Sequence, residues 1–210
     1  APSRTELAVD RLGRHDAQDR FMLAAARLAF DLTLPTETKG DQALGLPVRD
    51  EVWMRRLFEK AIAGFYQVTL TPFGWKVVAG KPLQWAMEAP TSRIAEIFPT
   101  MRTDIILDPP SEGRIVIDTK FTSLLTEGWW KTATLRSGYI YQIYAYLRSQ
   151  AGRGDSRADR ASGLLLHPAI QEEVDESVTI QGHRIRFATV NLADDAVAIR
   201  NRLLSLIATP

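Results

Sequence analysis

Two aspartates and a lysine lie on either side of a strong turn signal in the middle of the chain. Asp104 precedes one apolar run, and Asp118 and Lys120 end a second. Between the runs, residues 108–113 read Asp-Pro-Pro-Ser-Glu-Gly, which favours a reversal of the chain. An antiparallel register centred on Ser111 places Asp104 opposite Asp118, with Cβ atoms about 4.5–5.5 Å apart. Lys120 then projects from the same face as Asp118.

Two carboxylates at this distance repel each other, so either one of them binds a proton or a cation lies between them. Oxygen ligands favour Mg²⁺ or Mn²⁺ as that cation. Lys120 would then be placed to orient a water on the metal or to neutralise charge on a phosphate. The alternative is a chance pattern on a solvated hairpin. The continuous apolar runs favour the first interpretation, because they are typical of strands buried on both faces.

A third acidic residue, Glu59, lies in a helix that we predict from Asp50, a candidate N-cap, to Tyr66. The apolar residues of this helix cover one broad arc, and at about 100° per residue Glu59 falls at its edge. An acidic residue there is usually a solvated flank. Glu59 becomes a candidate metal ligand only because a site at Asp104 and Asp118 needs a further carboxylate.

Gln142 and Tyr146 are four residues apart in a helix predicted over 139–150, so they share one helical face. The alternative is an aromatic packing helix with a surface amide. Residues 128–154 contain no acidic residue, and basic side chains alternate there with aromatic ones. Such a surface is typical of nucleic-acid-binding proteins. The candidate DNA contacts are Trp129, Trp130, Lys131, Arg136 and Arg148.

Composition excludes several classes of protein. The 210 residues include 26 basic and 25 acidic side chains, and the net charge of +1 excludes globally basic binding of nucleic acid but not a local basic groove. Cysteine is absent, which excludes disulfides, thiolate zinc sites, iron–sulfur clusters and cysteine nucleophiles. No run approaches the roughly 18 apolar residues of a membrane span, and no signal peptide is evident. We therefore expect a cytoplasmic protein without membrane contact.

The elements predicted around these residues indicate an α/β fold. Helices are predicted over 16–32, 50–66, 139–150 and 193–207. Strands are predicted over 68–70, 75–78, 83–87, 103–107, 114–121, 163–167, 178–180 and 184–191, the last two as a hairpin. This order predicts a domain over 48–210 with a central mixed sheet flanked by helices, preceded by an N-terminal helical segment and linker over 1–47.

Together the motifs resemble the PD-(D/E)xK nuclease superfamily, whose core has an acidic residue on a first helix, an Asp on one strand and (Asp/Glu)-x-Lys on the next. The spacing of Gln142 and Tyr146 resembles the QxxxY signature of its RecB-like branch. Over about residues 15–170 the motifs are similar, and in the same order, to McrC, the nuclease subunit of McrBC modification-dependent restriction systems. They are Leu-Phe-Glu-Lys at 57–60, Met-Arg-Thr-Asp-Ile at 101–105, Asp-Thr-Lys-Phe at 118–121, Tyr-Gln-Ile-Tyr-Ala-Tyr at 141–146 and Leu-Leu-Leu-His-Pro at 164–168.

The resemblance implies a restriction-endonuclease-like core and a Mg²⁺-dependent DNA endonuclease, with Mn²⁺ as a substitute. The metal ligands that it implies are Asp104, Asp118, Glu59 and the backbone carbonyl of Thr119. Lys120 would orient the attacking water or stabilise charge on the phosphate, and Gln142 and Tyr146 would hold Lys120 and the DNA backbone. We expect Asp118 and Lys120 at a strand end outside the core, so that replacing either changes stability by less than about 1 kcal/mol.

The resemblance also implies a partner, an McrB-like AAA+ GTPase motor, although we expect the N-terminal region with which McrC engages the motor to be missing from this chain. Two other classes of protein remain open. One is the same fold without catalysis, acting as a DNA-binding or assembly module. The other is an α/β interaction domain in which the motifs are coincidental.

Overall fold

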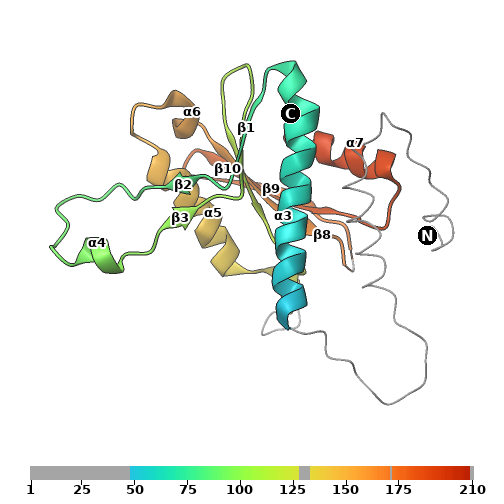
Figure 1. The fold of residues 1–210 in the computed structure, drawn as a ribbon, viewed down its shortest axis with the longest axis horizontal. Helices are drawn as coiled ribbons and strands as arrows, with labels where there is room; N and C mark the ends of the chain where they lie inside the picture. The colour runs from blue at the N-terminus through green and yellow to red at the C-terminus, as the bar shows by residue number, and fades with distance from the viewer. Residues whose placement is uncertain (1–47, 128–132, 171, 209–210) are drawn as a thin grey trace, which may run out of the picture.

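The computed structural model describes residues 48–127, 133–170 and 172–208, around a mixed six-stranded sheet of order β1-β4-β5-β8-β10-β9 (Figure 1). Its strands are β1 (Lys76–Ala79), β4 (Ile105–Asp108), β5 (Ile115–Thr119), β8 (Ser162–Pro168), β9 (Asp175–Ile180) and β10 (His183–Val190). Strands β5, β8 and β10 run parallel, and the outer pairings are antiparallel. The predicted α/β class with a central mixed sheet is confirmed. The segment 1–47, with its predicted helix and linker, lies outside the described residues.

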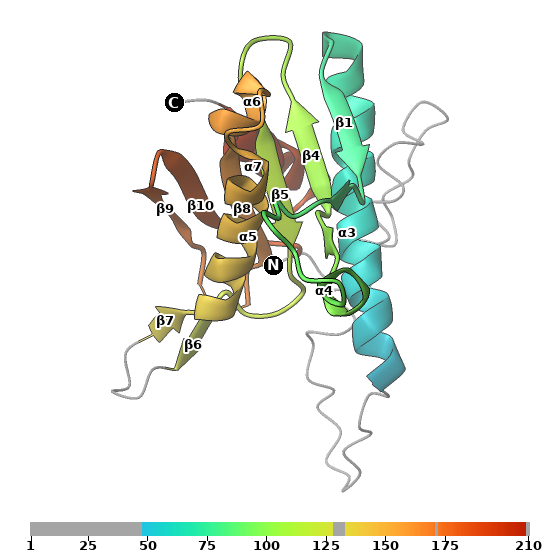
Figure 2. The same ribbon diagram turned by 90° about the vertical axis from the view of Figure 1, so that its left-hand side faces the viewer.

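Helices cover both faces of the sheet. Helices α3 (Val48–Leu70) and α7 (Ala196–Ile207) pack on one face, and α5 (Ser137–Gln150) packs on the other (Figure 2). Because side chains alternate along a strand, Ile105 of β4 contacts the α3 side, while Ile106 contacts the α5 side. The prediction that these apolar strands are buried on both faces is confirmed. In the described part of the chain, no helix is both long and apolar enough to cross a membrane.

Helix α3 is longer than the sequence predicted. Five of its buried side chains repeat every fourth residue, which is the spacing of one helical face. They are Met54, Phe58, Ile62, Tyr66 and Leu70, and Ala61 is buried as well. The predicted strand 68–70 is therefore wrong, because Leu70 completes this stripe. Pro72 follows within a short 3-10 turn, η1 (Thr71–Phe73). Asp50 lies inside the helix rather than at its N-cap.

The second half of the chain follows the prediction closely. Strands β9 and β10 form the predicted hairpin, with positive φ angles at Gln181 (48°) and Gly182 (85°), as a type I′ turn requires. Helix α7 begins later than predicted, after Asp195, whose carboxylate accepts a hydrogen bond from the backbone N–H of Ala198 at 2.8 Å. Strand β8 lies where the sequence predicted it.

The small elements were not predicted, and the strand predicted over 83–87 is wrong beyond its first residue. The missed elements are β2 (Pro82–Leu83), α4 (Ile94–Ile97), β3 (Met101–Arg102), β6 (Leu125–Glu127), β7 (Ala133–Leu135) and α6 (Ser156–Asp159). The strands among them pair over two or three residues and the helices span four, too few to leave a periodic pattern. Tertiary contacts stabilise such segments instead; the indole N–H of Trp85, for example, donates to the backbone oxygen of Pro99 at 2.7 Å.

Candidate active site

The register of the central hairpin is the one that the sequence predicted. Strands β4 and β5 pair Ile105 with Ile117 and Ile106 with Val116. One further step along this register brings Asp104 opposite Asp118. The position of the turn and the apolar runs were therefore sufficient to predict that the two acids are cross-strand neighbours.

Asp104 is fixed by the neighbouring strand. Its Oδ2 accepts hydrogen bonds from the backbone N–H of Thr119 at 2.7 Å and from the Thr119 hydroxyl at 2.8 Å. Its backbone oxygen accepts from the N–H of Gly80 at 2.7 Å. Because Oδ2 receives both donors of Thr119, the carboxylate is held in one orientation, with Oδ1 left for another partner.

Asp118 is fully buried, with 0% of the residue exposed. Lys120 Nζ forms an ion pair with its Oδ2 at 2.5 Å, and among the described residues neither carboxylate oxygen accepts a hydrogen bond. Burial raises the pKa of Asp118 to about 6; the charges of Asp104 and Glu59 act in the same direction, and Lys120 opposes them. The expectation that Asp118 lies outside the core is wrong, because α5 covers this end of β5.

Glu59 approaches the aspartates from α3. It is half-buried, and its pKa is raised first by burial and then by the charge of Asp104. Arg102, Lys120 and Lys60 lower it. Glu59 is thus within electrostatic reach of Asp104, as the sequence analysis predicted for the third acid.

Helix α5 brings Gln142 and Tyr146 toward the same acids. The Gln142 side-chain amide donates to the Tyr146 hydroxyl at 2.6 Å, so the two share a face as predicted. Burial raises the pKa of Tyr146, and the charges of Asp118 and Asp104 add to the effect. The predicted roles of Gln142 and Tyr146 toward Lys120 and DNA stay predictions.

The side chain that lies against Lys120 is Tyr139, which the sequence analysis did not single out. Lys120 Nζ lies 5.4 Å from the centroid of the Tyr139 ring, a distance at which a cation is attracted to the ring face. Tyr139 precedes Gln142 by three residues and therefore shares its helical face. That spacing was the available signal, although the four tyrosines of the helix also fitted the alternative of an aromatic packing helix.

His167 is a second residue that sequence reasoning missed. Its Nδ1 lies 2.8 Å from the backbone oxygen of Thr122, and a carbonyl only accepts, so Nδ1 bears the proton. Its Nε2 is a buried acceptor with no partner among the described residues. Burial lowers the pKa of His167 to about 4, assisted by the positive charges of Lys120 and Arg136, so the imidazole is neutral at neutral pH.

The acid cluster fits a hard divalent cation as a two-carboxylate site. Among the described residues, no group of three or more His, Asp or Glu side chains has the arrangement of a metal-ligand set. Mg²⁺, however, is often held by one or two carboxylates and keeps several waters. The unpartnered oxygens of Asp118 and the oriented carboxylate of Asp104 meet this requirement. A direct bond from Glu59 to the same ion is not evident from the geometry.

The candidate DNA surface is described only in part. Arg136, immediately before α5, and Arg148, in its last turn, are both exposed. Twelve residues of helix separate them by about 18 Å. The positive charge of Arg136 lowers the pKa of His167, so Arg136 lies at the end of α5 that is nearest to the acid cluster. Trp129, Trp130 and Lys131 lie outside the described residues.

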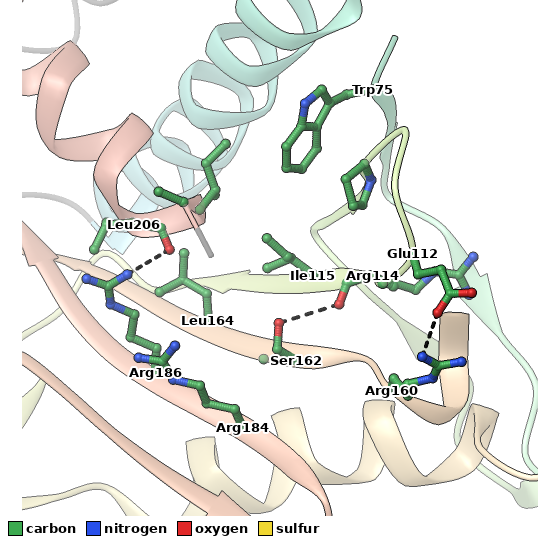
Figure 3. Close-up of a pocket in the computed structure, with 15 residues that line it drawn as sticks. Trp75, Glu112, Arg114, Ile115, Arg160, Ser162, Leu164, Arg184, Arg186 and Leu206 are labelled. Carbon is green, nitrogen blue, oxygen red and sulfur yellow. Dashed lines mark hydrogen bonds and ion pairs between the residues drawn. The ribbon is translucent and has the colours of Figure 1, made fainter. Parts of the chain in front are cut away.

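A separate pocket of about 390 Å³ opens at the other end of the sheet (Figure 3). Its apolar lining includes Trp75 and Leu164, and none of the acids of the site borders it. At its rim Arg160 forms an ion pair with Glu112 at 2.5 Å. The pocket is therefore distinct from the acid cluster.

The fold is an α/β domain with a central mixed sheet. Two aspartates and a lysine lie at the end of its central hairpin, and a glutamate of helix α3 approaches them. The chain belongs to the McrBC family: the family model described as "McrBC 5-methylcytosine restriction system component" matches residues 37–168, more than half of the chain. The relationship to McrBC restriction systems that the motifs predicted is thereby confirmed.

Proteins similar to this chain include a curated restriction enzyme and one chain of a solved assembly. This chain is 24% identical over 194 residues to the type IV methyl-directed restriction enzyme EcoKMcrBC of Escherichia coli K12, a match that covers 92% of this chain and 54% of that protein. The chain thus spans about half the length of this curated relative. It also matches a chain in the refined half-complex from a tetradecameric assembly of Thermococcus gammatolerans McrB AAA+ hexamers with bound McrC, with 14% identity, 97% coverage of this chain, 50% coverage of that chain and a TM-score of 0.45.

Proposed function

We propose that this chain is the nuclease part of an McrC-like subunit, with a PD-(D/E)xK core that hydrolyses phosphodiester bonds of DNA in a Mg²⁺-dependent reaction. The observation that supports this most directly is Asp118, a buried carboxylate opposite Asp104 that is ion-paired with Lys120 and accepts no hydrogen bond from the described residues. A buried charge whose oxygens lack hydrogen-bond donors is costly, and a cation binding site gives it a function. Membership of the McrBC family supports the same conclusion.

Each residue of the site has its own role in the proposed reaction. Asp104, Asp118 and the Thr119 carbonyl would hold the metal, with Glu59 acting through water. When bound, Mg²⁺ supplies positive charge against the charge that develops on the phosphate oxygens. Lys120, held between the Asp118 carboxylate and the Tyr139 ring, stabilises the same charge or orients the attacking water.

A DNA-binding or assembly module without catalysis is the second candidate. The lack of a three-ligand acid group among the described residues favours it. The two candidates differ in what they require of Asp118, since only the nuclease needs its negative charge.

The experiment compares wild type with Asp118→Asn and with Glu176→Gln, a control at an exposed carboxylate on edge strand β9. Mg²⁺ and Mn²⁺ binding is measured by calorimetry, and cleavage is measured on DNA of the cognate modification. We expect Asp118→Asn to lose both metal binding and cleavage and Glu176→Gln to keep both. Metal binding by Asp118→Asn with wild-type affinity would reject the assigned site. DNA binding by wild type without any metal binding would favour the inactive module.

A further inference from the structure

A second cation, Arg102, is held beside the acids by contact with a glycine. Arg102 ends β3, two residues before Asp104, and its guanidinium lies against the backbone of Gly80. A Cβ atom on Gly80 would lie 2.5 Å from Nη2 and 3.0 Å from Nε of Arg102. Gly80 has a φ of 62°, in the left-handed region that favours glycine. The glycine therefore provides both the turn and the space for the guanidinium.

The same turn is bonded to the segment that contains Asp104. The N–H of Gly80 donates to the backbone oxygen of Asp104 at 2.7 Å, and the N–H of Thr103 donates to that of Lys81 at 3.0 Å. Strand pairing of Pro82 with Arg102 continues the connection. Gly80, Arg102 and Asp104 thus form one unit, in which the guanidinium keeps a fixed relation to the acid.

Arg102 also differs from the arginines that stabilise the fold. Arg114 and Arg186 each form ion pairs with an aspartate, at 2.7 and 2.6 Å. In the part of the chain that the structure describes, no ion pair involves Arg102, which is exposed. The positive charge of Arg102 nevertheless lowers the pKa of Glu59. A guanidinium that is supported in this way and forms no ion pair with the described residues is available to an anionic ligand.

We propose that Arg102 binds a backbone phosphate of the DNA next to the acid cluster, in a site that the Gly80 backbone completes. This inference rests on the proposed nuclease function and names a substrate contact for it. The planar guanidinium fork matches two phosphate oxygens at once. A site with two or three carboxylates repels a polyanion, and a fixed cation at its edge reduces that repulsion.

The test is duplex-DNA binding in EDTA, measured by fluorescence anisotropy between 50 and 200 mM salt. Arg102→Met should lower the magnitude of the salt slope by about 0.9, the value of one phosphate contact. The ratio of the wild-type affinity for DNA to that of Arg102→Met should therefore fall about threefold between 50 and 200 mM salt. Arg102→Lys should keep the slope, because the charge remains. Arg184→Met, at the opposite end of the sheet, is the matched control and should change neither quantity.

Substitution of Gly80 tests the support without changing a charge. Gly80→Asn adds the Cβ that displaces the guanidinium, and asparagine tolerates a positive φ better than alanine does. We expect weaker DNA binding in the wild-type background and no effect in the Arg102→Met background, a non-additivity that reports contact between the two sites. Thermal unfolding shows whether the Gly80→Asn variant folds. If it does not, the Arg102→Met variant still tests the proposal, because it changes only an exposed side chain.

The outcomes separate this inference from the proposed function. DNA binding by wild type with an unchanged salt slope in Arg102→Met would overturn the Arg102 site and leave the nuclease proposal in place. If wild type binds no DNA either in EDTA or with Ca²⁺, the Arg102 site is overturned, whereas the nuclease proposal is decided separately by the metal-binding and cleavage assays of Asp118→Asn.

Discussion

Asp104 and Thr119 are joined across two strands by two hydrogen bonds, because a single carboxylate oxygen accepts from both the N–H and the hydroxyl of the threonine. The backbone bond persists whatever residue occupies position 119. The hydroxyl bond depends on the side chain. Thr119 is 9% exposed, so water replaces a lost donor there poorly.

Thr119→Val should therefore lower the free energy of unfolding by about 1 kcal/mol, because it removes the hydroxyl donor and keeps the side-chain shape. It should also weaken Mg²⁺ binding, since the Asp104 carboxylate then keeps only one of the two hydrogen bonds that orient it. Urea unfolding in EDTA and calorimetric metal titration measure the two effects. Thr119→Ser is the control, because it keeps the donor; metal binding weakened equally in both variants would argue against a role for this hydroxyl.

Burial of Asp118 predicts a specific dependence of stability on pH. The folded-state pKa of about 6 lies above the ordinary aspartate value of 3.8, so the folded protein binds the proton more tightly than the unfolded chain does. The contribution of this group to stability is therefore present at low pH and is lost as pH rises from about 4 to about 6. Above pH 6, in EDTA, the ionised group costs up to about 3 kcal/mol.

Asp118→Asn should accordingly raise the free energy of unfolding above pH 6 by about 1–2 kcal/mol, less than the full cost because the buried amide still lacks partners. Below pH 4, where the wild-type carboxyl is protonated, the variant should be less stable than wild type by about 1–2 kcal/mol, since the difference between the two proteins changes by about 3 kcal/mol between the pH limits. Urea unfolding across pH 4–8 in EDTA measures the difference. Parallel stability curves for the two proteins would mean that Asp118 does not titrate in this range.

Loss of Lys120 should have the opposite effect on stability. Lys120→Met removes the cation that is ion-paired with the buried Asp118 carboxylate, and we expect a loss of about 1–3 kcal/mol at pH 8. This exceeds the limit of about 1 kcal/mol that the sequence suggested. Cleavage should be abolished as well. The double variant with Asp118→Asn should be more stable than Lys120→Met alone, whereas additive effects would exclude coupling of the two side chains.

Contacts between residues that are close in sequence leave a local pattern, whereas contacts between distant segments do not. The register that brings Asp104 opposite Asp118 follows from a turn and two apolar runs, all within twenty residues, so it was predictable. Burial of Asp118 depends on α5, which begins almost twenty residues later and crosses over the end of β5. The contact between Lys120 and Tyr139 and the support of Arg102 by Gly80 likewise join segments that no local period connects.

Charge reversal at Arg136 and Arg148 tests the basic face of α5. Arg136→Glu and Arg148→Glu should each weaken DNA binding and lower the magnitude of the salt slope by about 0.9 or more, because fewer counterions are released. Arg136 lies at the acid end of the helix, so its variant should also lose more cleavage. Arg200→Glu, exposed on α7, is the control. An unchanged slope in both α5 variants would place the DNA elsewhere on the molecule.

The last prediction concerns a motor partner. The chain spans about half of its Escherichia coli relative, a methyl-directed restriction enzyme, and we expect it to cleave DNA poorly by itself. Cleavage should appear when an McrB-like GTPase and GTP are supplied, because the nuclease would then be delivered to modified DNA.

The assay incubates the purified chain with modified and unmodified DNA in Mg²⁺ or Mn²⁺, with and without the motor and GTP. Lys120→Ala is the control for the assigned chemistry and should be inactive under every condition. Robust cleavage by the chain alone would reject dependence on the motor and keep the nuclease assignment. Cleavage by Lys120→Ala at the wild-type rate would show that the active site lies elsewhere, since no other described ammonium lies within 4 Å of the Asp118 carboxylate.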